Sequence, residues 1–141
     1  MGRILAIDYG RKRTGLAVTD PLRITANPLL TLPTNDLPRW IEDYLKKEQV
    51  DEVVIGLPTQ MNGQESESMQ YIRPFMNYFR NRWPDTPLIP YDERFTSTLA
   101  HRAMIDGGMK RKQRQDKSVV DKLAACIILE GYLERFKTGT I

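Results

Sequence analysis

The most constraining feature of the sequence is a short apolar run, residues 53–57, that lies between two segments with helical spacing. The run begins with two valines, contains no charged residue and is stopped by Pro58, which is typical of a central strand buried on both faces. Apolar residues recur every three or four positions in residues 37–45 before it and in residues 69–79 after it. A strand between two helices predicts parallel crossover connections, and therefore an α/β fold.

The other expected elements follow from the same kinds of pattern. They are a hairpin of strands 3–8 and 14–18, a weaker strand 28–32 that Pro28 places at its start or at a sheet edge, a brief strand 87–91, a helix from Thr96 or Ser97 to Gly107, and a last helix over about residues 118–136. Pro74 is expected to kink the helix at 69–79 or to mark its true start. Because no repeat or linker composition appears, we expect one domain over residues 1–141.

Composition narrows the class of protein. The chain has 141 residues, a formal net charge of +3 and a sequence pI near 9.1, which favours an anionic partner. A single cysteine, Cys126, excludes a disulfide within the chain, and with only one histidine it cannot form a zinc site of Cys and His ligands. We expect Cys126 to be a core residue. The first apolar run is too short for a signal peptide or a membrane span, so we expect a soluble, cytoplasmic protein with no membrane partner.

Three acidic positions stand where functional side chains are expected. Asp8 ends the apolar first strand, and the pair Asp92-Glu93 follows the strand at 87–91. The ends of parallel strands meet at one sheet edge, so these acids should lie close together. Alternation sends Asp92 and Glu93 to opposite faces, and either could face the shared site. Asp121 lies near the start of the last helix, next to an apolar stretch. A turn aspartate, an acidic loop and a helix-start acid remain the structural alternatives.

Acidic oxygens without histidines favour a hard cation, Mg²⁺ or Mn²⁺. Two such ions can activate water and stabilise the leaving oxygen in phosphodiester hydrolysis. Basic residues that could contact a phosphate backbone come before and after these acids. They are Arg11, Lys12 and Arg13 after Asp8, Arg94 after Glu93, and Lys110, Arg111, Lys112 and Arg114 before the last helix. A solvated loop is the alternative interpretation of each cluster.

Four segments then occur in one order along the chain. They are residues 6–18 (AIDYGRKRTGLAV), residues 56–58 with Asn62-Gly63, residues 92–97 (DERFTS), and Asp121 ahead of residues 124–129. Together they resemble the YqgF family, also called RuvX, over essentially the full chain. The resemblance implies an RNase H-like fold related to RuvC Holliday junction resolvases, with a mixed five-stranded sheet, an antiparallel hairpin at the N-terminus and helices on both faces. It also implies a bacterial cytoplasmic nuclease that processes the 5′ end of pre-16S ribosomal RNA.

The resemblance assigns Asp8 to the acid of the first strand, Asp121 to the acid of the last helix, and Glu93, in the Asp-Glu-Arg motif, to the third metal ligand. Two further RuvC acids have no counterpart, because none occurs around Gly56 and Ser118 stands at the additional helix position. The expected site therefore has three acids.

Our leading hypothesis is a metal-dependent endonuclease that acts on structured RNA, with branched DNA as a second substrate class. In it Asp8 bridges two ions, Glu93 and Asp121 complete their ligation, and the basic residues position the backbone. The missing fourth acid leaves an alternative open, a binding factor for structured RNA or branched DNA with little turnover. A Holliday junction resolvase is a further alternative.

Asp8-Tyr9-Gly10 followed by Thr14-Gly15 also resembles the first phosphate motif of the actin and hexokinase superfamily. An ATP-dependent phosphotransferase is disfavoured because that architecture needs two such domains. The sequence leaves open whether the protein is a monomer or a homodimer.

Overall fold

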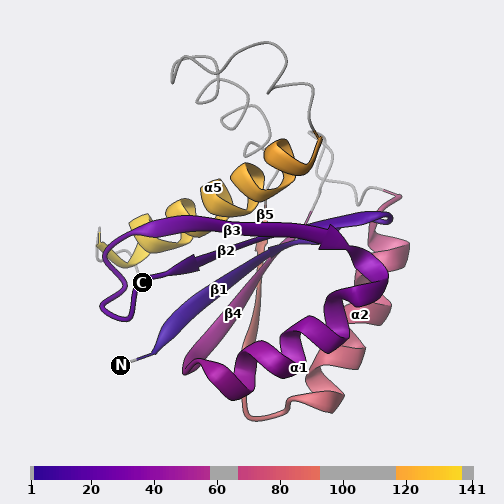
Figure 1. The fold of residues 1–141 in the computed structure, drawn as a ribbon, viewed down its shortest axis with the longest axis horizontal. Helices are drawn as coiled ribbons and strands as arrows, with labels where there is room; N and C mark the ends of the chain where they lie inside the picture. Colours follow the sequence, from indigo (N-terminus) through magenta and orange to yellow (C-terminus); the bar gives the residue numbers. More distant parts are fainter. Residues whose placement is uncertain (1, 58–66, 93–116, 138–141) are drawn as a thin grey trace.

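The computed structural model describes residues 2–57, 67–92 and 117–137, and within these ranges the strands form one mixed sheet. The strands are β1 (Arg3–Asp8), β2 (Arg13–Thr19), β3 (Ala26–Pro33), β4 (Val50–Leu57) and β5 (Leu88–Asp92). Their order across the sheet is β3-β2-β1-β4-β5 (Figure 1). Strand β2 is antiparallel to both of its neighbours, whereas β4 and β5 are parallel to β1. The predicted N-terminal hairpin and mixed five-stranded sheet are confirmed.

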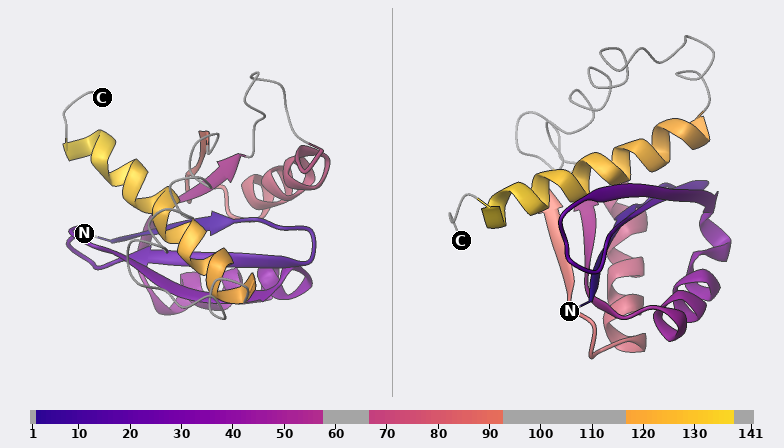
Figure 2. Two further views of the ribbon diagram at one scale, coloured as in Figure 1. Left: turned by 90° about the horizontal axis from the view of Figure 1, so that it is seen from above. Right: turned by 60° about the vertical axis from the view of Figure 1, so that its left-hand side comes forward.

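Helices cover both faces of this sheet, as expected. A short 3-10 turn, η1 (Thr34–Asp36), leads into α1 (Leu37–Lys47), and the other described helices are α2 (Met69–Arg82) and α5 (Lys117–Lys137). Figure 2 shows α1 and α2 on one side of the sheet and α5 lying across the other. None of the described helices is long and apolar enough to cross a membrane.

Strand β4 explains why two layers of helix are needed. Val53, Val54 and Ile55 are all fully buried. Because successive side chains point to opposite faces, Val53 and Ile55 join the cluster under α1 and α2, and Val54 joins the cluster under α5. An apolar strand of this kind is stable only between two covered faces, which confirms its predicted central place.

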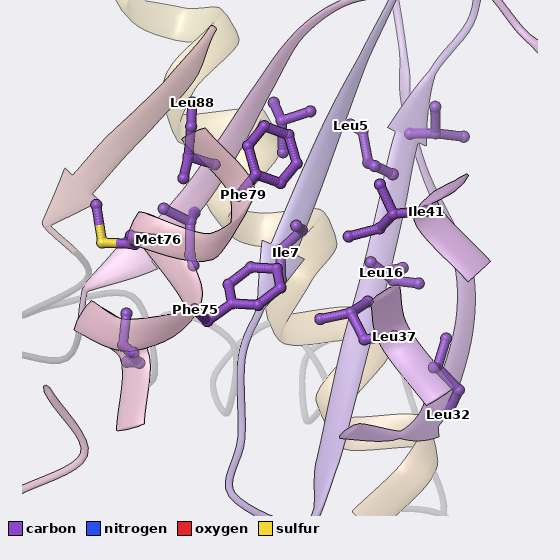
Figure 3. Packing of buried hydrophobic residues seen from close by; sticks show 14 of the residues in the cluster. Leu5, Ile7, Leu16, Leu32, Leu37, Ile41, Phe75, Met76, Phe79 and Leu88 are labelled. Carbon is purple, nitrogen blue, oxygen red and sulfur yellow. The ribbon is translucent and has the colours of Figure 1, made fainter. Parts of the chain in front are cut away.

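The face under α1 and α2, called here the α1–α2 face, is filled with large side chains (Figure 3). Leu5 and Ile7 of β1 and Leu16 of β2 form its floor, and Phe79 of α2 is fully buried against them. The rest of the buried cluster comprises Val18, Leu32, Leu37, Ile41, Val53, Ile55, Met69, Ile72, Phe75, Met76 and Leu88.

The face under α5, called here the α5 face, is built from smaller residues. Its sheet side consists of Ile4, Ala6, Ala17 and Val54. The buried residues of α5 are Ala125, Cys126, Ile128, Leu129, Tyr132 and Leu133. Cys126 is 7% exposed, which confirms its prediction as a core residue.

Two predicted elements differ from the structure. Helix α2 begins at Met69, so the suggestion that Pro74 marks its start is wrong. Pro74 is exposed, and the carbonyl that loses its amide partner there can be solvated. Strand β3 starts at Ala26 and ends at Pro33, longer than residues 28–32, because it pairs with β2 along its full length at the sheet edge. The helix predicted from Thr96 or Ser97 lies outside the described residues.

Candidate active site

The parallel strands β1, β4 and β5 end at the same edge of the sheet, called here the carboxyl edge. Ile7 of β1 pairs with Ile55 of β4, so Asp8 and Gly56 each follow by one residue. Gly56 in turn pairs with Tyr91 of β5. Asp8, Gly56 and Tyr91 therefore form one row across three strands, at the edge where the sequence predicted a site.

Asp8 lies on the α5 face of this edge. Ile4 and Ala6, its neighbours at even positions of β1, belong to the cluster under α5, and alternation assigns position 8 to the same face. Asp8 is half-buried, pairs in register with Gly15 of β2 and has a polar partner. A carboxylate at the end of an otherwise buried strand needs such compensation.

Helix α5 brings position 121 to this same face. Position 121 precedes buried Ala125 by four residues, and residues four apart share one side of a helix. In Figure 1 the first turns of α5 lie toward the side at which β1 ends. Helix α5 is fixed on the sheet near its other end, where the Tyr132 hydroxyl donates to Oε1 of Glu52 in β4 at 2.9 Å.

Helix α5 also comes close to β5 at Gly131. A Cβ atom on Gly131 would lie 2.5 Å from the hydroxyl oxygen of Tyr91. Tyr91 belongs to the carboxyl-edge row described above, so the absence of a side chain at Gly131 lets the helix approach that row closely.

The loop after Asp8 is held by Thr34 at the start of the 3-10 turn. The Thr34 amide donates to the Lys12 carbonyl at 3.0 Å, and the Thr34 hydroxyl donates to the Gly10 carbonyl at 2.6 Å. A hydroxyl has one proton, so the buried Thr14 hydroxyl donates to Thr34 Oγ1 at 2.9 Å. A Cβ on Gly10 would lie 2.2 Å from the Arg13 carbonyl oxygen, so only glycine fits this turn.

The same loop packs against α2 through two side chains. The Tyr9 ring stacks on Phe75 with centroids 4.8 Å apart, and the Arg11 guanidinium lies 5.1 Å from the centroid of Tyr71. Burial raises the pKa of Tyr9 above its ordinary value, so its phenol stays protonated at neutral pH. Tyr9 is therefore a packing residue, whereas Arg11 presents its charge at the carboxyl edge.

Charges are arranged differently at the two edges of the sheet. At the amino edge, Arg3 pairs with Glu48 at 3.3 Å and Arg23 pairs with Asp51. The Gly2 amide, together with Arg23, holds the pKa of Asp51 below its ordinary value. At the carboxyl edge, exposed Arg11 and Lys12 have no acidic partner among the described residues. Within the described ranges, these two cations of the carboxyl edge therefore differ from the paired arginines of the amino edge.

The structure brings together part of the predicted site. Asp8, Arg11, Lys12 and Arg13 share the carboxyl edge, and position 121 lies in the first turns of α5. Within the described ranges, no three acidic, His or Cys side chains gather in a way that could hold a metal ion. The remaining predicted site residues lie outside those ranges: Glu93, Arg94, Lys110, Arg111, Lys112 and Arg114.

Sequence analysis missed Thr34 and Tyr71. Thr34 contacts Gly10, 24 residues earlier in the chain, and no local sequence pattern predicts such a contact. Tyr71 had a weak signal, because it is an aromatic residue off the apolar stripe of its helix and is 36% exposed.

Comparisons with known proteins agree with this architecture. Residues 2–135 match the family model described as "RuvX: Holliday junction resolvase". A relative from Phocaeicola vulgatus is 57% identical over 97% of this chain and 99% of its own length. Relatives from Bacteroides fragilis and Flavobacterium johnsoniae are 54% and 51% identical, over 95% and 94% of this chain and 97% and 96% of their own lengths. All three are named as candidate pre-16S rRNA nucleases.

A solved structure supports the fold. The structure of T. thermophilus RuvC in complex with Holliday junction substrate superposes with a TM-score of 0.57, at 16% identity, and covers 98% of both chains. At this identity the likeness establishes the RNase H-like arrangement of sheet and helices.

Proposed function

Because the chain belongs to the RuvX family, we propose that it is a nuclease that hydrolyses phosphodiester bonds during 5′-end processing of pre-16S ribosomal RNA. Relatives more than 50% identical over nearly their whole length have that name. The observation that carries the proposal is the placement of Asp8, at the carboxyl edge and on the face that α5 covers.

The proposed active site consists of Asp8, Asp121 and Glu93. Asp8 and position 121 share the α5 face, which supports the first two assignments. Tyr91 also packs against the α5 cluster. Alternation along β5 therefore favours Glu93, two residues further, over Asp92 as the third acid.

The donor set fits a hard divalent cation, and we propose Mg²⁺ or Mn²⁺, bound as two ions by these carboxylates. The chain's single thiol is not at this edge, because Cys126 of α5 is buried against the sheet, and burial raises its pKa to about 11. Such ions supply an activated water and charge stabilisation of the leaving oxygen.

The chain's own residues hold and orient the RNA. Arg11 and Lys12 sit on the loop that follows Asp8, and Thr34 fixes the shape of that loop. Their charges contact backbone phosphates at the carboxyl edge. These contacts carry no base information and position the scissile bond. We propose the same role for Arg13, Arg94, Lys110, Arg111, Lys112 and Arg114.

The test is cleavage of a 5′-extended 16S rRNA precursor with Mg²⁺ or Mn²⁺. Removal of hydrogen-bonded groups around metal ligands costs about 10–100-fold, so Asp8→Asn and Asp121→Asn should each lower the cleavage rate by at least about 100-fold. Asp43→Asn, an exposed substitution in α1, is the matched control and should cleave like the wild type.

Equal cleavage by all four proteins would overturn the proposed site and point to a contaminating RNase. RNA binding without cleavage by the wild type would overturn the nuclease and favour the binding factor. A four-way DNA junction assayed in parallel tests whether branched DNA is also cut.

A further inference from the structure

A cavity of about 310 Å³ lies on the opposite face from Asp8, between α2 and the carboxyl ends of β4 and β5. Its apolar wall consists of Leu57 and Pro90 from the strands and Met69 and Met76 from the helix. Nothing in the nuclease mechanism described above uses this cavity.

The polar side of the cavity is a strip along α2. Arg73, Asn77 and Arg80 line it at intervals of four and three residues, which places them on one side of the helix. The Arg80 guanidinium donates to the Leu88 carbonyl at 3.2 Å, a bond that orients it and uses one of its five N–H donors. The cavity thus combines two guanidinium groups and an amide with an apolar wall.

We propose that this cavity binds one unpaired nucleotide of the RNA substrate, and this inference rests on the proposed function. The base would pack on the thioethers and Pro90, Asn77 would meet its polar edge, and Arg73 and Arg80 would face the phosphate. The volume is at the lower end of small-ligand pockets, about 300–1,000 Å³. It suits a single nucleotide better than a dinucleotide cofactor, and a paired base cannot enter.

The position of the cavity fits a strand that passes through the active site. Leu57 follows Gly56, which lies in the row of Asp8. Neighbouring strands are about 4.8 Å apart, so along the sheet Leu57 of β4 lies about one strand spacing from β1, although the cavity opens on the other face from Asp8. An RNA chain that crosses the carboxyl edge at β4 would reach both.

Methionine methyl signals give a direct test, because Met69 and Met76 line the cavity. The full chain, labelled with ¹³C at the methionine methyl groups, is titrated in EDTA with a single-stranded RNA of about ten nucleotides. We expect both methyl signals to shift as the RNA binds, and a blunt duplex of the same sequence to leave them unchanged. RNA binding that saturates without moving them would overturn the proposal, as would equal shifts with the duplex.

Two matched substitutions separate the cavity from the rest of the helix. Asn77→Trp fills the cavity, whereas Asn81→Trp places the same side chain on an exposed position of α2 that does not line it. Fluorescence anisotropy should show single-stranded RNA affinity about tenfold weaker for Asn77→Trp and almost unchanged for Asn81→Trp. Thermal unfolding by circular dichroism verifies that both variants are folded, and equal affinities of the two variants would contradict the proposal.

The source of the nucleotide and the nuclease activity are tested separately. A nucleoside monophosphate that moves both methyl signals as effectively as the RNA would identify a free nucleotide as the ligand and overturn the RNA-strand assignment. Because binding is measured in EDTA, methyl shifts with a wild type that does not cleave would refute the nuclease and leave the cavity site standing. Cleavage that Asn77→Trp leaves unchanged, together with unmoved signals, would refute only the cavity site.

Discussion

The two faces of the sheet are stabilised in different ways. The α1–α2 face is filled by bulky side chains such as Phe75 and Phe79, whose rings lie 6.3 Å apart in a tilted contact. The α5 face has alanines at positions 6, 17 and 125, and among the described helices only α5 covers it. Large side chains bury more apolar area, whereas small ones let a helix backbone approach the sheet.

The difference indicates that one face mainly stabilises the fold and the other mainly positions the proposed active site. The α1–α2 face supplies much of the fold's burial, and the α5 face determines where α5, with Asp121, lies relative to Asp8. Substitutions on the first face should therefore change stability most, and substitutions on the second should change activity more than their effect on stability suggests.

The largest effect is expected from Phe79→Ala on the α1–α2 face. Phe79 is fully buried, and truncation of such a ring costs about 3–5 kcal/mol through lost burial and a residual cavity. Urea unfolding measures the loss. Tyr78→Ala, the exposed neighbour, should cost less than about 1 kcal/mol. Similar losses for the two variants would show that this face does not dominate stability.

An intermediate effect is expected from Gly131→Ala on the α5 face. The new methyl group meets the Tyr91 hydroxyl, and overpacking of about 1–3 kcal/mol is partly offset by a gain of about 1 kcal/mol in helix propensity. We expect a net loss of about 1 kcal/mol together with a larger relative loss of RNA cleavage.

Tyr91→Phe removes the oxygen in that contact, so the double variant should recover part of both losses. A double-mutant cycle on unfolding free energy and cleavage rate measures the coupling. A Gly131→Ala protein that is more stable than the wild type would mean that the helix does not depend on this close approach.

The smallest effect is expected at Cys126. Burial, with a contribution from Glu130, raises the pKa of its thiol to about 11, from an ordinary value of 9.0. The neutral thiol is favoured in the folded state, so its contribution is fully present below about pH 9 and is lost as the pH rises toward 11. The Cys126→Ala variant has no thiol to titrate. The difference in unfolding free energy between it and the wild type, measured by urea unfolding, should therefore be constant up to about pH 9 and should change only above it.

The same thiol reports on opening of the α5 face. A thiol reagent at pH 8 should label Cys126 only when α5 leaves the sheet. Fast labelling of the native protein would show that this face is loosely packed, and labelling accelerated equally by Phe79→Ala and Gly131→Ala would remove the distinction between the faces.

The sequence predicted much of the fold because the signals are local. Residues 53–57 indicated a central strand, and β4 contains them with both faces buried. Asp8 was expected at a strand end and lies there. Pro74 misled because the helix continues through it, at an exposed position where water can solvate the carbonyl that loses its amide partner.

The features that the sequence did not predict depend on residues far away in the chain. Gly131 was not singled out in the sequence, and only the fold identifies Tyr91 as the side chain that a Cβ there would meet. Thr34 and the arginine strip of α2 likewise acquire their surroundings from segments far away in the chain. Glu93 remains a prediction.

The hydrogen bonds of Thr34 have a direction. Because its single proton goes to the Gly10 carbonyl, Thr34 can only accept from Thr14, and the two hydroxyls form a one-way chain from β2 to the loop beside Asp8. Replacing either threonine by serine preserves this polarity, whereas valine at position 34 interrupts it at both ends. These two hydrogen bonds tie the loop that carries Arg11 and Lys12 to the 3-10 turn before α1. The conformation of the loop therefore depends on the packing of the α1–α2 face.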